Sequence, residues 1–162
     1  MLLKSFGIIL LLTGSLYLCF SFSQFERKRL RQCEGFLLLL RHIRAQISCF
    51  RMPIGRIYAS FSTEELEQCG FLSLLRDTED LEKALLGAKG NIWISEEEIS
   101  LLKAFGRELG EGYAEEQIAV CDYYIGELEK AYGERRNGLP QQTKLYRSLF
   151  ITGGLMLAIM LL

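Results

Sequence analysis

The chain has 162 residues and a formal net charge of −1, from 19 Lys and Arg and 20 Asp and Glu. This length suits one folded domain with membrane segments, and the balanced charge argues against nucleic acid or an acidic substrate as a partner. The five cysteines form no C-x-x-C pair, and the single histidine excludes the usual zinc-binding spacings. We therefore expect no metal, no cofactor, and reduced thiols that pack as small buried hydrophobes.

Residues 1–25 are predicted to be an N-terminal transmembrane anchor. Residues 5–25 carry no charge, and about 21 helical residues extend roughly 32 Å, enough for a hydrocarbon core of roughly 30 Å. A cleaved signal peptide is the alternative, but the basic residues that follow oppose export. Those residues mark the cytoplasmic side of the membrane or, alternatively, bind anionic lipid headgroups. They are Arg27, Lys28, Arg29 and Arg31.

Residues 26–145 are predicted to form an all-α compact bundle with a long antiparallel helix pair, because no segment shows the two-residue alternation of a strand. The first helix can continue the membrane helix without a break and should end near Phe50 or Arg51, because residues before Pro53 avoid the helical region. Its predicted buried stripe consists of Leu30, Cys33, Leu37, Leu40, Ile43 and Ile47, widened by Leu38 and Leu39.

Short helices are expected in the middle of the chain. One follows Pro53, and the next begins at Ser62 or Thr63 as N-cap and stops at Gly70. Thr78 is then predicted to cap a helix that ends at Gly87 or Gly90. Core positions predicted for this region are Ile54, Ile57, Tyr58, Phe61, Phe71, Leu72, Leu74, Leu75, Leu81, Leu85, Leu86 and the apolar residues of Gly90–Ile94, which include Trp93.

Two longer helices follow. Ser95 and Glu98 fit a capping box, and Gly110 should end the helix that they start. The second begins near Ala114, and Gly138 and Pro140 are predicted to break or kink it. The predicted buried residues are Ile99, Leu102, Phe105 and Leu109 in the first helix, and Ile118, Cys121, Ile125, Leu128 and Tyr132 in the second.

Residues 146–162 are predicted to be a short C-terminal transmembrane segment. About 15 apolar residues follow Arg147 and reach about 22 Å, which is short for a full crossing. Snorkelling of Lys144 and Arg147 could close the gap, and a helix buried in the bundle is the alternative. Because both basic flanks face the bundle, we expect both termini outside and the bundle in the cytoplasm.

The sequence contains no phosphate-binding loop, no dinucleotide-binding fingerprint and no H-E-x-x-H motif, so no catalytic residue is assigned and no enzymatic activity is expected. A membrane-bound hydrolase is a weaker alternative, since His42 is the only histidine available as a base. Acidic residues on the predicted helix surfaces form a candidate partner-docking face, unless they are simply solvated. They are Glu64, Glu65, Glu97, Glu108, Glu115 and Glu116.

Three passages resemble the stage III sporulation protein AB family. The first joins the basic stretch Phe25–Gln32 to the leucine-rich helix before Pro53-Ile54. The most distinctive is Phe105-Gly106, Leu109-Gly110 and Gln117, which we interpret as a structural signature. The last consists of Tyr146-Arg147-Ser148-Leu149 and Gly153-Gly154-Leu155. The chain departs from the family pattern between Gly110 and Gln117, where a serine–aspartate pair usually caps the long helix, and at Gly138–Pro140.

The resemblance implies a non-enzymatic platform component of the complex that joins mother cell and forespore in endospore-forming bacteria. The family is similar to the cytoplasmic domain of the inner-membrane platform proteins of type II secretion and type IV pilus machines. The implied partners are the mother-cell membrane, other channel-complex proteins and a cytoplasmic ATPase, stage III sporulation protein AA. No nucleic acid or small-molecule substrate is expected. A membrane-anchored lipid-binding or assembly adaptor unrelated to secretion is the alternative function.

Overall fold

The computed structural model describes residues 2–50, 52–110 and 112–161. Within the helices, the side chains of residues 2–12, 15–16, 18–19, 50, 142–143, 146–147, 154–155, 157–158 and 160–161 lie outside the description. The chain divides into two compact units, one formed by Arg29–Glu134 and one formed by the two terminal segments. The regular structure of the described residues is entirely helical, which confirms the all-α prediction.

The terminal segments are helical parts of α1 (Leu2–Phe50) and α7 (Ala114–Leu161). Among the helix residues that the structure describes, none forms a segment both long and apolar enough to cross a membrane. The membrane assignments of residues 1–25 and 146–162 therefore remain predictions.

The part of α1 within the unit Arg29–Glu134 supplies one wall of the core. The predicted stripe is confirmed from Cys33 to Ile47, since Cys33, Leu37, Leu39, Leu40, Ile43 and Ile47 are all at most 5% exposed. The prediction for Leu38 is wrong, because this side chain is 44% exposed. Each helical residue turns by about 100°, so four consecutive leucines cannot all face one side. The helix ends at Phe50 as predicted, and Arg51 lies outside the described residues.

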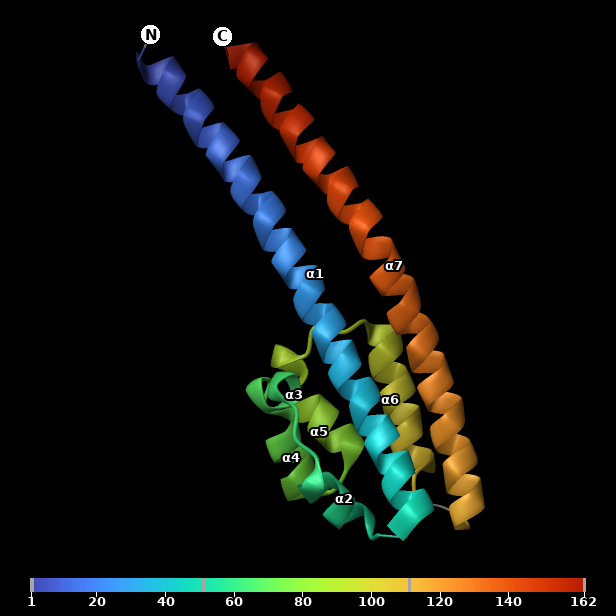
Figure 1. Ribbon diagram of the computed structural model, residues 1–162. Helices are drawn as coiled ribbons and strands as arrows, with labels where there is room; N and C mark the ends of the chain where they lie inside the picture. The colour runs from blue at the N-terminus through green and yellow to red at the C-terminus, as the bar shows by residue number, and fades with distance from the viewer. Residues whose placement is uncertain (1, 51, 111, 162) are drawn as a thin grey trace. The chain divides into compact units, whose positions relative to one another are not determined.

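Four short helices follow (Figure 1): α2 (Ile54–Ser60), α3 (Glu64–Gln68), α4 (Phe71–Thr78) and α5 (Leu81–Gly87). Helix α5 packs against both α4 and α6. Phe71 is fully buried, and its ring meets that of Phe36 edge-on at 5.0 Å. Thr63 is the N-cap of α3 as predicted, although its side chain makes no capping hydrogen bond.

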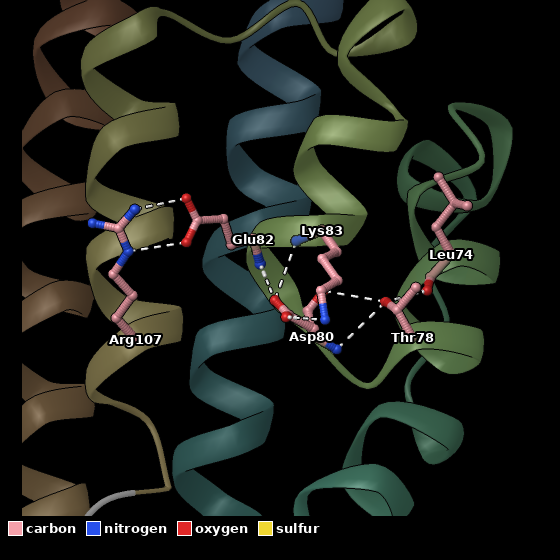
Figure 2. Close-up of polar contacts among 6 residues, drawn as sticks. All are labelled: Leu74, Thr78, Asp80, Glu82, Lys83 and Arg107. Atoms are coloured by element: carbon pink, nitrogen blue, oxygen red, sulfur yellow. Dashed lines mark hydrogen bonds and ion pairs between the residues drawn. The ribbon is translucent and has the colours of Figure 1, made fainter.

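The start of α5 differs from the sequence prediction (Figure 2). Thr78 is the last residue of α4, and its hydroxyl donates to the carbonyl oxygen of Leu74 at 2.7 Å. The N-cap of α5 is instead Asp80, whose Oδ1 accepts from the backbone N–H groups of Glu82 at 3.0 Å and Lys83 at 3.1 Å. Asp80 and not Thr78 is the N-cap because its carboxylate, directly before the first turn, accepts hydrogen bonds from two N–H groups that would otherwise be unpaired.

The connector between α5 and α6 is only partly buried. Helix α5 ends at Gly87, as predicted, and a single turn of 3₁₀ helix, η1 (Lys89–Asn91), follows. Leu86 and Trp93 are 53% and 42% exposed, so their predicted burial is wrong, whereas Ile92 and Ile94 are buried.

Helix α6 (Glu96–Glu108) begins with the predicted capping box between Ser95 and Glu98. In α7, Cys121, Ile125 and Leu128 are buried, and Ile118 and Tyr132 pack against the core while partly exposed. Of the predicted break or kink at Gly138 and Pro140, the break is wrong, because α7 continues through this proline. The kink stays a prediction. A proline costs a helix about 3 kcal/mol, which the many other hydrogen bonds of a long helix can outweigh.

Two ion pairs connect α1 to α7 within the unit Arg29–Glu134. Arg41 Nη2 lies 2.6 Å from Glu129 Oε1, and Arg44 Nε lies 2.6 Å from Asp122 Oδ1. As the residue number rises along α1, that of its partner on α7 falls. The predicted long antiparallel pair is therefore present in this unit.

Candidate docking surface

The turn between α6 and α7 is built on tight packing of the end of α6. Phe105 is fully buried, and its ring centroid lies 5.6 Å from that of Tyr124. A Cβ atom on Gly106 would lie 3.1 Å from Leu81 Cβ, which is closer than ordinary van der Waals contact. A side chain at position 106 would therefore require Leu81 to move by a few tenths of an ångström.

The backbone of the turn depends on two glycines. Gly110 has φ +94° and Gly112 has φ +85°, a left-handed region that residues with a Cβ avoid. Gln117 Nε2 donates to the carbonyl oxygen of Gly112 at 3.2 Å, and Glu116 Oε2 accepts from the N–H of Tyr113 at 3.1 Å. These two side chains cap the turn without a serine–aspartate pair; Glu111 lies outside the described residues.

Three of the predicted docking residues lie at this turn. Glu108 is the last residue of α6, and Glu115 and Glu116 are in the first turn of α7; all three are exposed. The hydroxyl of Tyr124 donates to Glu108 Oε1 at 2.8 Å. Burial and this hydrogen bond raise the pKa of Tyr124 to about 12, so the phenol stays a proton donor at neutral pH. Three exposed carboxylates therefore lie on the two helix ends that flank this turn.

The other three predicted docking residues lie elsewhere. Glu97 is in the first turn of α6, at the end of that helix opposite to Glu108. Glu64 and Glu65 are in the first turn of α3, which packs against α4. Carboxylates in a first helical turn stabilise the helix through its dipole, whatever else they do. The docking face remains a prediction, and the turn between α6 and α7 is the place where three of its members come together.

The predicted membrane-flanking residues differ in exposure. Arg27, Lys28, Arg31 and Lys144 are exposed. Arg29 is partly buried and makes contacts within the protein. The side chain of Arg147 lies outside the described ones.

A comparison with protein families gives one match. The family model for stage III sporulation protein AB matches residues 4–162, nearly the whole chain. The chain belongs to this family. The resemblance inferred from the sequence is thereby confirmed, and the protein is a sporulation protein. Among curated proteins and solved structures, none matches the chain.

In this member of the stage III sporulation protein AB family, the most distinctive passage of the sequence has a structural explanation. Phe105 and Leu109 anchor the end of α6 in the core, Gly106 allows α5 to approach, Gly110 reverses the chain, and Gln117 fixes the following turn.

Two side chains of this family member that nucleophilic catalysis would use, those of His42 and Cys121, are engaged within the fold. His42 Nε2 lies 3.0 Å from Ser60 Oγ, and burial raises the pKa of the Cys121 thiol to about 11, which disfavours the reactive thiolate. Within the described residues, no group of three or more His, Cys, Asp or Glu side chains could hold a metal ion.

Three residues with notable contacts or exposure were not identified as candidates from the sequence. Gln32 is 6% exposed and binds the backbone of the α5–α6 connector, a contact that no local sequence pattern predicts. Tyr113 and Tyr123 are 82% and 61% exposed. Tyr123 could have been found, because it falls outside the apolar spacing of Cys121, Ile125 and Leu128.

Proposed function

We propose that this protein is a non-enzymatic, membrane-held docking component of the sporulation complex between mother cell and forespore. Its apolar ends anchor it in the mother-cell membrane that faces the forespore, with both termini outside and the helical bundle in the cytoplasm. The bundle engages a cytoplasmic ATPase, for which stage III sporulation protein AA is the expected partner. Membership of the family and the uncharged stretch of residues 5–25 support this proposal.

The observation that carries the docking part is the turn between α6 and α7. Gly110 and Gly112 have positive φ, Gln117 binds the carbonyl oxygen of Gly112, and Glu108, Glu115 and Glu116 are exposed at the flanking helix ends. Exposed charges gathered in this way can steer and orient a basic partner surface. Exposed Tyr113 adds an aromatic ring, a residue type enriched in protein interfaces.

Charge reversal tests the docking surface. The variant Glu108→Lys, Glu115→Lys, Glu116→Lys should lose most of the ATPase recovered with the full-length chain from sporulating cells. A matched control reverses Glu64, Glu65 and Glu97, which changes the net charge equally at other places, and should retain the ATPase. Equal recovery with both variants and the wild type would refute this docking surface, and absence of the ATPase from the wild-type capture would refute the partner.

The lipid-binding adaptor is a second candidate, because Arg27, Lys28 and Arg31 are exposed. Basic residues near a membrane each contribute about 1 kcal/mol of binding to anionic headgroups. An adaptor of this kind would recover no ATPase, and it would lose its preference for anionic vesicles when these three residues are changed to Gln.

A further inference from the structure

The connector between α5 and α6 is held on α1 by one buried side chain. Gln32 Nε2 donates to the carbonyl oxygen of Asn91 at 2.9 Å, and the N–H of Trp93 donates to Gln32 Oε1 at 2.7 Å. Gln32 is 6% exposed, so water competes poorly for these bonds. They fix the position of Trp93 next to Gln32.

The indole of Trp93 is turned away from the core. Its neighbours Ile92 and Ile94 are 8% and 5% exposed, whereas Trp93 is 42% exposed. Ile92 has extended backbone angles, and side chains in extended chain alternate between opposite sides. Burying both isoleucines therefore presents the one tryptophan of the chain to the outside.

Gln32 directly follows the basic stretch predicted to lie at the membrane surface. Arg31 belongs to that stretch and is exposed. The backbone of Trp93, which binds Gln32, is thus one residue along α1 from a group expected among lipid headgroups. Tryptophan is enriched at this level, since its ring is apolar and its N–H finds polar partners there.

We propose that Trp93 inserts into the headgroup layer of the bilayer that anchors the chain. This inference rests on the membrane anchoring of the proposed function.

The charges around the connector favour a membrane contact through the aromatic ring over an electrostatic one. Lys89 Nζ lies 3.5 Å from Glu96 Oε1 at the surface, and Glu34 and Glu97 are also exposed. The three carboxylates outnumber the one lysine, so the connector is not a basic patch. The contact should come from partition of the aromatic ring and should not be strengthened by anionic lipid.

Because Trp93 is the one tryptophan, its fluorescence reports this contact directly. The full-length chain is reconstituted into phosphatidylcholine vesicles, with and without lipids brominated near the headgroup end of the acyl chains. We expect a blue-shifted emission and a loss of its intensity to the bromine atoms, as for an indole at the membrane interface. Adding phosphatidylglycerol should not increase the loss.

A matched control moves the reporter to the far end of the bundle. Tyr113 is 82% exposed and precedes α7, on the side of the Arg44–Asp122 pair opposite to the Arg41–Glu129 pair and thus away from Gln32. In the double variant Trp93→Phe, Tyr113→Trp, the emission should be unaffected by brominated lipid. Equal quenching at both positions would overturn the proposal that the contact belongs to Trp93.

The remaining outcomes separate the two proposals. If the chain stays with the vesicles after alkaline carbonate washing but Trp93 is not quenched, the membrane contact of Trp93 is wrong and the anchoring stands. If the chain is removed by the wash, the anchoring itself is wrong, and the contact of Trp93 falls with it.

Discussion

Replacing Gln32 with Leu should destabilise the bundle and release the α5–α6 connector. Leucine fills a similar volume, but it removes the acceptor for the N–H of Trp93 and the donor to the carbonyl of Asn91. A backbone group left without a partner costs about 1–3 kcal/mol when it is buried. The bond to the Trp93 N–H is part-buried and Asn91 is exposed, so water replaces part of this loss. We therefore expect a fall of about 1–2 kcal/mol in the free energy of unfolding.

The effect can be localised by hydrogen exchange of the full-length chain. Amides of residues 88–95 should exchange faster by about 5- to 30-fold, which corresponds to the same 1–2 kcal/mol. The control is Gln68→Leu, which removes an exposed 3.0 Å hydrogen bond to Glu64 and should change stability by less than about 0.5 kcal/mol. A Gln32→Leu variant as stable as this control would refute the role given to Gln32.

The isosteric variant Gln32→Glu separates the hydrogen bonds from packing. Its carboxylate can still accept from Trp93 but repels the carbonyl of Asn91, and burial should raise its pKa above the unfolded value of about 4.3. When the pKa of a carboxyl group is higher in the folded than in the unfolded state, protonation of that group favours the folded protein. The deficit relative to the wild type should therefore be largest at neutral pH and shrink as the pH falls through the folded-state pKa. A deficit independent of pH would contradict this reasoning.

Three further predictions test other parts of the structure. Asp80→Ala should cost about 1 kcal/mol in denaturant unfolding and Thr78→Ala clearly less, because Asp80 is the N-cap of α5. Hydrogen bonds from backbone N–H groups, that of Lys83 first, lower the pKa of Asp80 in the folded state. Asp80 therefore stabilises the fold at pH values above its unfolded pKa, and this stabilisation should disappear as the pH falls through its folded pKa. A constant difference in stability between Asp80→Ala and the wild type down to acid pH would contradict this. Gly106→Val should lower stability by about 1–3 kcal/mol by overpacking α6 against α5, and a neutral effect would show that this contact can relax. The exposed thiol of Cys49 should react with a thiol reagent at mildly alkaline pH much faster than the thiol of Cys121, because burial raises the pKa of Cys121 to about 11. Mass spectrometry of each site measures the ratio of the two reaction rates. Equal rates would mean that Cys121 is not shielded.

Much of the fold could be predicted because helix ends and apolar periodicity are local signals. The capping box at Ser95 and the end of α1 before Pro53 both follow from chemistry within a few residues. The choice between Thr78 and Asp80 failed because both side chains can cap a helix, and only the position of the first turn decides between them.

The misplaced residues show where local patterns stop being informative. Leu38 lies in a run of leucines that occupies more of the helix than the core can cover, so one of them is left outside. Leu86 and Trp93 are apolar but lie at the edge of the core, where the number of neighbours depends on the path of the whole chain.

Within the candidate site, the residues of the turn were recognisable but their arrangement was not. Gly106 and Gly110 stand out in the sequence, yet their close approach to Leu81 and Ile54 depends on α5 and α2. Gln32 gave no signal, because its partners are 59 and 61 residues away in the chain. Long-range polar contacts of this kind follow from the tertiary fold and not from periodicity.

The central claim is that two apolar ends hold a helical body at the cytoplasmic face of a membrane. Cysteines introduced at Leu3 and Leu161 of the full-length chain, probed on intact cells with a membrane-impermeant thiol reagent and read site by site by mass spectrometry, test it most directly. We expect both introduced thiols to be labelled from outside, while the exposed native Cys49 is labelled only after the membrane is permeabilised. Labelling of Cys49 on intact cells, or protection of both introduced thiols until permeabilisation, would contradict the account.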